Sequence, residues 1–213
     1  MTKKVIAVIG GTGKSGKYVV HALLAKGFAV RALVRDADKL GNLRTQVDVI
    51  QGDVCNDEAL STLLRSCDAV ISTLGQPQGG TPIFSTAARY ILAAMERQGI
   101  QRYIVVTGLS IDVPGDTKGE RSQQLSAYMR SSYPAIIADK QQEYTALTQS
   151  RADWTLVRLP LIEQTNKRRG IIISETDCPG DKISTSDLAD FLISQLDDKC
   201  YLRKAPFIAS RPE

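Results

Sequence analysis

The stretch Val5-Ile6-Ala7-Val8-Ile9-Gly10-Gly11-Thr12-Gly13-Lys14-Ser15-Gly16 decides the fold of this chain. An unbroken apolar run, mostly β-branched, leads directly into a cluster of glycines, and helix-forming sequence follows from Lys17 to Lys26. This order predicts a buried strand, a tight turn and the start of a helix. A strand, a glycine turn and a helix in this order are typical of the first unit of a dinucleotide-binding domain.

Three glycines of this turn have the spacing G-x-x-G-x-x-G, and each has a physical use. Gly10 can take a positive φ where the strand ends. Gly13 lets the backbone approach a pyrophosphate, whose charge is stabilised by the free N–H groups and the dipole at the helix N-terminus. Gly16 lets the helix pack closely against the strand. The residues expected to bind the cofactor in this turn are Gly10, Thr12, Gly13, Lys14, Ser15 and Gly16.

The same turn has a second interpretation, because Lys14 and Ser15 after Gly13 resemble the end of a phosphate loop, G-x-x-x-x-G-K-S/T. That pattern requires a glycine five residues before Gly13, and the position holds Val8, inside the predicted strand. A nucleoside triphosphatase is therefore excluded at the first residue of its motif.

The composition predicts one globular domain without a nucleic-acid partner. The 213 residues can bury a full core, and the net charge is only +4, from 27 basic and 23 acidic residues. The one basic cluster, Lys167-Arg168-Arg169, is expected to be a solvated loop between strands. We expect a single domain over residues 1–213 that binds neither nucleic acid nor membrane and is a monomer or a homodimer.

Signals for export, membrane insertion and metal binding are not apparent in the sequence. The chain passes from its first four residues directly into the predicted strand, and no apolar stretch reaches the length of a membrane span. Cys55, Cys67, Cys178 and Cys200 are scattered without C-x-x-C spacing, which predicts neither a disulfide framework nor a zinc site. We therefore expect a cytoplasmic protein with reduced thiols and no metal.

Predicted strands and helices alternate along the chain. Strands are expected at 28–34, 47–51, 68–73, 102–107, 154–158 and 205–209, and helices at 57–65 and 82–98. This alternation predicts an α/β, doubly wound and mostly parallel sheet, which is a Rossmann fold. Ligands of such sheets bind beyond the carboxyl ends of the strands. Besides the glycine turn, the residues placed there are Arg35, Asp53, Ser72, Thr73, Leu74, Gly75, Thr107, Gly108, Leu109 and Ser110. Asp53 is expected beside the adenine or as a turn residue.

The end of the second strand bears on the choice of cofactor. Rossmann proteins that prefer NAD place an acidic residue there, which accepts hydrogen bonds from the ribose 2′-hydroxyl. Here the strand ends at Arg35, and a planar guanidinium suits a 2′-phosphate. Asp36 follows directly, but it stands at the position that caps the next predicted helix, and we therefore interpret it as a helix cap and not as the acidic residue that binds NAD. We predict NADP as the cofactor, with NADPH preferred over NADH, Arg35 as the main phosphate ligand, and Lys14 or Lys39 as helpers.

Several motifs together resemble the short-chain dehydrogenase/reductase superfamily, in its atypical branch with NmrA-like and biliverdin reductase B-like flavin reductase members. The resemblance covers nearly all of the chain and implies an NAD(P)-binding Rossmann domain with substrate-side elements at about 108–135 and 160–185. It also implies that Val54 and Pro160 contact the cofactor. The motifs are the glycine turn, Gly52-Asp53-Val54, Ser72-Thr73-Leu74-Gly75, Asp153-Trp154-Thr155-Leu156-Val157-Arg158-Leu159-Pro160 and Ile183-Ser184-Thr185-Ser186-Asp187-Leu188-Ala189-Asp190-Phe191.

The chain departs from this superfamily in its catalytic residues. Most members use a Y-x-x-x-K pair, in which Tyr donates the proton while Lys lowers the pKa of Tyr and holds the nicotinamide ribose. Alignment on residues 153–155 places Lys140 at the family Lys, but Ile136 stands at the Tyr position. Tyr133 and Tyr144 are nearby and are expected to be ordinary packed or surface residues. The remaining catalytic candidates are Lys140, Thr107 and Ser110.

Two further segments are expected on the substrate side. Residues 111–134 have an irregular composition that suits a mobile flap over the nicotinamide end. The apolar residues Pro160, Leu161 and Ile162 form either one wall of a substrate pocket or plain core. His21, inside the first helix, is expected at the surface or in an interface.

Two functions of different classes fit these features. The first is an NADPH-dependent oxidoreductase that transfers hydride to a small-molecule electron acceptor, namely a flavin, a quinone or a similar planar compound. Such an acceptor can take its proton from solvent, whereas an alcohol or ketone substrate needs a placed acid. The second is a non-catalytic, NADP(H)-binding redox sensor of the NmrA-like kind that passes its state to a protein partner.

Overall fold

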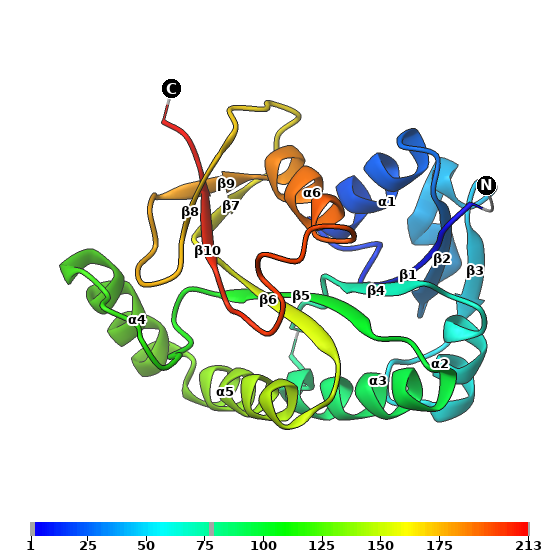
Figure 1. The fold of residues 1–213 in the computed structure, drawn as a ribbon, viewed down its shortest axis with the longest axis horizontal. Coiled ribbons are helices and arrows are strands. Elements are labelled where there is room, and N and C mark those ends of the chain that lie inside the picture. Colours follow the sequence, from blue (N-terminus) through cyan, green and yellow to red (C-terminus); the bar gives the residue numbers. More distant parts are fainter. Residues whose placement is uncertain (1–2, 77–78, 213) are drawn as a thin grey trace.

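The computed structural model describes residues 3–76 and 79–212. These residues form one large, mostly parallel sheet (Figure 1). Its strands are β1 (Val5–Ile9), β2 (Ala29–Val34), β3 (Asp48–Gln51), β4 (Ala69–Ser72), β5 (Arg102–Gly108), β6 (Asp153–Leu159), β8 (Ile171–Ser174) and β10 (Phe207–Ser210). They lie in the order β3-β2-β1-β4-β5-β6-β10-β8, with β8 antiparallel to β10. Two short strands, β7 (Leu161–Glu163) and β9 (Lys182–Ser184), pair in parallel beside this sheet.

Helices cover both faces of the sheet (Figure 1). One face carries α1 (Gly16–Ala25) and α6 (Thr185–Ser194), and the other carries α2 (Asp57–Leu64), α3 (Phe84–Gln98) and α5 (Pro134–Gln149). A 3₁₀ helix, η1 (Ala37–Leu43), follows β2, and α4 (Glu120–Ser132) lies at the edge of the molecule next to α5. The predicted doubly wound Rossmann fold in a single domain is confirmed. Within the described residues, no helix combines the length and the apolar character that crossing a bilayer requires.

The burial of β1 explains why its sequence is continuously apolar. Successive residues of a strand point to opposite faces of the sheet. Ile6 and Val8 accordingly pack into the core beneath α1 and α6, whereas Ala7 and Ile9 pack into the core beneath α2 and α3. A parallel strand covered on both faces has no polar side, so its sequence does not alternate.

The helix starts follow from side-chain capping. Asn56 Oδ1 accepts from Ala59 N at 2.9 Å at the start of α2, and Ser184 Oγ accepts from Asp187 N at 2.9 Å at the start of α6. Both side chains satisfy an N–H group that the first helical turn leaves unpaired.

The third helix, α3, has a different kind of cap. It begins at Phe84, two residues after the predicted start, and its cap comes from another helix. Asp139 of α5 accepts from Phe84 N at 2.7 Å and from Ser85 N at 3.3 Å. This contact fixes α5 against the N-terminus of α3.

Residues 111–134 do not form the expected irregular flap, and that prediction was wrong. The segment contains α4, which the sequence did not reveal because its buried residues are the small, polar Ser122 and Ser126 and leave no apolar stripe. The residues before α4 are attached on several sides. Thr117 N donates to Thr176 O at 2.9 Å, and the amide of Gln141 in α5 exchanges two hydrogen bonds with the backbone of Asp112.

The strand order determines where a ligand can bind. From β1 the chain moves outward to β2 and β3, and then returns to β4 on the other side of β1. The carboxyl ends of β1 and β4 therefore flank the point where the winding direction changes. In open α/β sheets, ligands bind at this switch point.

Candidate functional site

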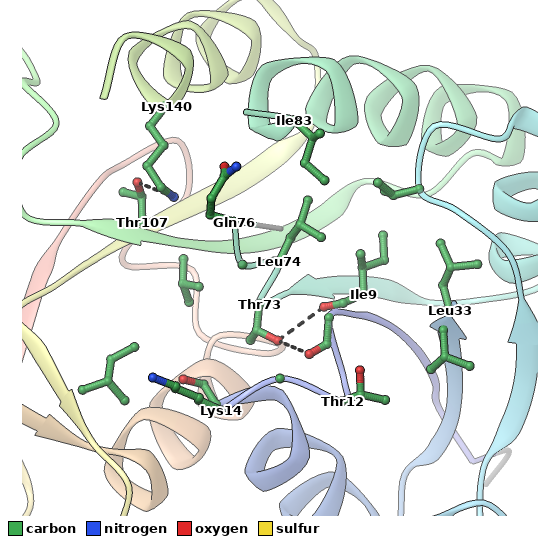
Figure 2. Close-up of a pocket in the computed structure, with 18 of the residues that line it drawn as sticks. Ile9, Thr12, Lys14, Leu33, Thr73, Leu74, Gln76, Ile83, Thr107 and Lys140 are labelled. Atoms are coloured by element: carbon green, nitrogen blue, oxygen red, sulfur yellow. Dashed lines mark hydrogen bonds between the residues drawn. The ribbon is translucent and has the colours of Figure 1, made fainter. Parts of the chain in front are cut away.

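A cavity of about 530 Å³ lies at this switch point, along the carboxyl ends of β1, β2, β4, β5 and β6 (Figure 2). The glycine turn and Arg35 line one part of it, and Lys140 and Pro160 line another. The cavity thus lies where the strand-end rule predicted it. The predicted residues that line it are Gly10, Thr12, Gly13, Lys14, Ser15, Arg35, Asp53, Val54, Thr73, Leu74, Gly75, Thr107, Lys140 and Pro160.

The glycine turn has the geometry that its spacing predicted. Gly10 has a φ of +78°, and Gly13 N donates to Gly10 O at 2.9 Å, which closes the turn. Gly16 lies behind the cavity, where an added Cβ would stand 2.1 Å from Gly10 O. Only glycine at this position lets α1 pack so closely against the end of β1.

Thr73, the first residue after β4, supports this turn. Its Oγ1 donates toward Ile9 O at 3.3 Å and Gly10 O at 3.2 Å (Figure 2). The hydroxyl joins the ends of the two strands that flank the switch point. Thr73 therefore has a structural role in the turn in addition to lining the cavity.

Arg35 lies at the end of β2 with an exposed side chain that reaches the cavity. Asp36 acts as the predicted cap, because its Oδ1 accepts from Asp38 N at 3.0 Å at the start of η1. Of the two helper lysines, Lys14 lines the cavity, whereas Lys39 is not among its lining residues. Arg35 is therefore the residue at the end of β2 that lines the cavity, whereas Asp36 is engaged as a cap.

Asp53 is a turn residue that also lines the cavity, and its place beside the adenine stays a prediction. Its Oδ1 accepts from Cys55 N at 2.9 Å, which is a local turn, and the residue also lines the cavity beyond the end of β3. The carboxylate therefore reaches the cavity from a fixed turn.

Lys140 enters the cavity from α5, on the side of β5 (Figure 2). Its Nζ lies 3.4 Å from Thr107 Oγ1 and 3.7 Å from the centroid of the Phe84 ring. Burial lowers the pKa of Lys140, while the carboxylates of Glu143 and Asp139 raise it. The aromatic face stabilises the ammonium in these buried surroundings.

The other candidate side chains near Lys140 lie elsewhere. Ser110 is buried outside the cavity, because β5 ends at Gly108 and the chain turns away; its carbonyl accepts from Arg130. Tyr144 packs edge-on against Trp154, with ring centroids 6.0 Å apart, and Tyr133 is exposed between α4 and α5. The described lining residues of the cavity therefore include Lys140 and Thr107 but neither tyrosine.

The family follows from a comparison with known proteins. The family described as NAD(P)H-binding matches residues 10–199. This chain belongs to that NAD(P)H-binding family. The match begins at Gly10 of the glycine turn and extends through α6, so it includes almost all of the strands that carry the cavity.

Similar proteins include plant reductases of greater length. Isoflavone reductase homolog A622 of Nicotiana tabacum is 26% identical over 214 residues, which cover 95% of this chain and 67% of that protein. Phenylcoumaran benzylic ether reductase TP7 of the same plant is 31% identical over 110 residues, covering 47% of this chain and 34% of that protein. The matched part thus spans between about one third and two thirds of these relatives.

Solved structures show the same fold along their whole length. ChuY, described as an anaerobillin reductase from Escherichia coli O157:H7, has a TM-score of 0.82 and 21% identity, covering 99% of this chain and 100% of that chain. A short-chain dehydrogenase/reductase from Veillonella parvula, solved with NADP, has a TM-score of 0.81 and 16% identity, covering 98% and 95%. At these identities the likeness concerns the fold alone.

Sequence reasoning missed several lining residues. Most are apolar or glycine residues next to a predicted strand end, and a wider reading of the strand-end rule includes them. Ile83, which precedes α3, has no such signal, since it reaches the cavity only through the packing of α3 on α5. The missed residues are Ile9, Leu33, Val34, Gly52, Gln76, Ile83, Val106 and Leu159, whereas Gly108 belonged to the predicted strand ends and Ile162 was left open between pocket wall and core.

Proposed function

We propose that this protein is an NADPH-dependent oxidoreductase that transfers hydride to a flavin, a quinone or a similar planar acceptor. The observation that carries the proposal is the pairing of Lys140 with Thr107 in the cavity while Ile136 stands at the family Tyr position. A planar acceptor that takes its proton from solvent needs a held cofactor and a stacking surface, and it does not need a placed Tyr. The reductases among the similar proteins support the same class.

The residues present fit an NADP(H) molecule. In its reduced form, NADPH, the bound cofactor would supply the hydride. The backbone of the glycine turn and the N-terminal end of α1 would hold the pyrophosphate over Gly13, where a Cβ would already stand 3.2 Å from Gly10 O. Arg35 would hold the 2′-phosphate. Lys140 would hold the nicotinamide ribose and Thr107 would keep the ammonium in place.

The acceptor would lie against an apolar wall beside Lys140. Leu159, Pro160 and Ile162 line the cavity there, and the adjacent Leu161 is 67% exposed. Such a surface suits stacking of a flat ring system and excludes water from the reacting faces. From the sequence, Pro160, Leu161 and Ile162 were expected to form either a pocket wall or plain core. We propose that they form the wall.

The test is an acceptor screen. The protein is mixed with NADPH and either FMN or a quinone dye, and the NADPH absorbance band is followed. Steady loss of absorbance, dependent on the protein, is the expected result. Tight NADP binding without reduction of any acceptor would contradict it and would favour the NADP(H)-binding redox sensor, which the Ile at position 136 fits equally well.

Lys140→Met is expected to weaken NADPH binding about tenfold and to slow acceptor reduction, because the lost ammonium made a charged hydrogen bond to the ribose. Fluorescence titration and initial rates measure the two effects. Lys199→Met, at an exposed lysine outside the cavity lining, is the matched control and should behave as wild type. Wild-type affinity and rate in Lys140→Met would make Lys140 a structural lysine only.

Arg35→Ala is expected to lose about 1.5–3 kcal/mol of NADPH affinity, the contribution of a charged hydrogen bond, and to leave NADH affinity nearly unchanged. Parallel titrations with both cofactors measure the difference, and Arg65→Ala, at an exposed arginine outside the cavity lining, serves as the control. Equal losses for NADPH and NADH would show that Arg35 does not contact the 2′-phosphate.

A further inference from the structure

A buried acid lies beside Lys140 and has no part in the proposed reaction so far. Glu143, one helical turn further along α5, is 4% exposed, and among the described residues its Oε2 has no hydrogen-bond partner. An unpaired carboxylate oxygen in a protein interior costs free energy, and an apolar residue would fill the same space without that cost. A costly group of this kind one helical turn from Lys140, which lines the cavity, is a reason to look for a function.

The groups that face Glu143 come from α5, α3 and the sheet. On α5 they are Asp139 and Lys140; Asp139 is engaged with Ser85 and the N-terminus of α3. From β5 comes Tyr103, buried beside the Ser72 hydroxyl of β4, and burial raises the pKa of Tyr103 well above its usual range. The positive charge nearest to Glu143 in this group is the ammonium of Lys140. Glu143 therefore lies one helical turn from the ammonium of Lys140, which lines the cavity, while Glu143 is not among the described lining residues.

We propose that Glu143 is a positioning residue that balances the charge of Lys140 at the nicotinamide end of the cavity. Its ionised carboxylate offsets the ammonium when the nicotinamide ring carries the positive charge of the oxidised cofactor. In low-dielectric surroundings such charges act on one another strongly. This inference rests on the placement of the nicotinamide beside Lys140 in the proposed function.

The ionisation of Glu143 falls in the neutral range. Burial raises the pKa of Glu143 to about 7; Lys140 opposes this shift and Asp139 adds to it. Below this pH Glu143 is neutral, the Lys140 ammonium is uncompensated, and the reduced cofactor with its neutral ring is favoured. Above it Glu143 is charged, and the oxidised cofactor binds relatively better. The ratio of the dissociation constants, NADP⁺ over NADPH, must therefore fall as the pH rises through about 7.

The experiment titrates the protein with NADP⁺ and with NADPH, without any acceptor, between about pH 5.5 and about pH 8.5. The ratio cancels the titration of the 2′-phosphate, which both cofactors carry. For the wild type we expect the ratio to fall at least about threefold across this range. In Glu143→Gln the step near neutral pH should disappear, whereas Glu143→Asp should keep it. Glu96→Gln, at an exposed position of α3, should match the wild type.

A second variant separates Glu143 from Lys140. In Lys140→Gln the step should persist with a higher midpoint, because the cation that lowers the pKa of Glu143 is gone. A step that persists in Glu143→Gln and disappears in Lys140→Gln would assign the titration to Lys140 and overturn the proposal. A pH-independent ratio in the wild type would also overturn it. If Glu143→Gln does not fold by circular dichroism, Glu143→Met replaces it with the same expected result.

This test is independent of acceptor turnover. A protein that reduces no acceptor but shows the step fails as a reductase and keeps the role of Glu143. A protein that reduces acceptors but shows a pH-independent ratio of dissociation constants keeps the proposed reductase function and contradicts the role of Glu143.

Discussion

Gly13→Val is expected to abolish binding of both NADPH and NADH, with a loss of at least about a hundredfold, while the domain stays folded. Gly13 is exposed on the cavity side of the turn, and its missing side chain leaves the space that the pyrophosphate would occupy. The branches of valine would fill that space. Fluorescence titration measures the affinity, and circular dichroism and thermal melting report the fold.

The neighbouring glycine supplies the contrast. In Gly16→Ala a Cβ would stand 2.1 Å from Gly10 O and 2.7 Å from Thr73 Oγ1, so this variant should lose stability in addition to binding. Gly13→Val should melt close to the wild type, because its Cβ meets only Gly10 O, at 3.2 Å. Retained cofactor binding in a folded Gly13→Val protein would mean that the turn is structural only.

Asp116→Ala is expected to lower the free energy of unfolding by about 3–5 kcal/mol, because it leaves a buried charge without its partner. Arg158 is 0% exposed, stacks on the Phe207 ring at 3.5 Å, and donates through Nη1 to Asp116 Oδ1 at 2.8 Å and Oδ2 at 2.7 Å. Burial lowers the pKa of Arg158, and Asp116 opposes that shift. Urea denaturation measures the loss.

Asp38→Ala is the control for this prediction. Asp38 also forms an ion pair, with Arg44 at 2.6 Å, but the side chains of Arg44 and Asp38 are 57% and 85% exposed. Exposed pairs contribute about 1 kcal/mol or less, so this variant should stay close to the wild type. If Asp116→Ala lost no more than Asp38→Ala, the backbone carbonyls around Arg158 would be sufficient partners for the guanidinium.

The Arg158–Asp116 pair also connects the residues before α4 with the proposed site. Arg158 in β6 lies opposite Thr107 in β5. The hydroxyl of Thr107 accepts a hydrogen bond from Lys140 Nζ. The pair holds the residues that lead from β5 to α4 against the sheet at this level. Arg158 belongs to the motif at residues 153–160 that the sequence revealed, whereas its partner Asp116 belongs to no such motif.

The sequence alone determined the glycine turn, the doubly wound sheet, the cap at Asp36 and the cavity at the strand ends. Each of these depends on backbone requirements within a few residues: a positive φ at Gly10, an unpaired N–H group at a helix start, or an apolar run covered on both faces. Such requirements restrict the residue types locally. They can therefore be predicted without knowing what packs against them.

Only the tertiary structure decided the surroundings of the charged groups and the existence of α4. Ser122 and Ser126 face inward without an apolar stripe, and Glu143 carries no local mark of burial. Asp116 and Arg158 are 42 residues apart in the chain. Whether a charge is buried, and which charge compensates it, depends on how α5, β6 and the residues before α4 pack together. Burial changes the electrostatic free energy of a side chain far more than its neighbours in sequence do, which is why these features could not be predicted from the sequence.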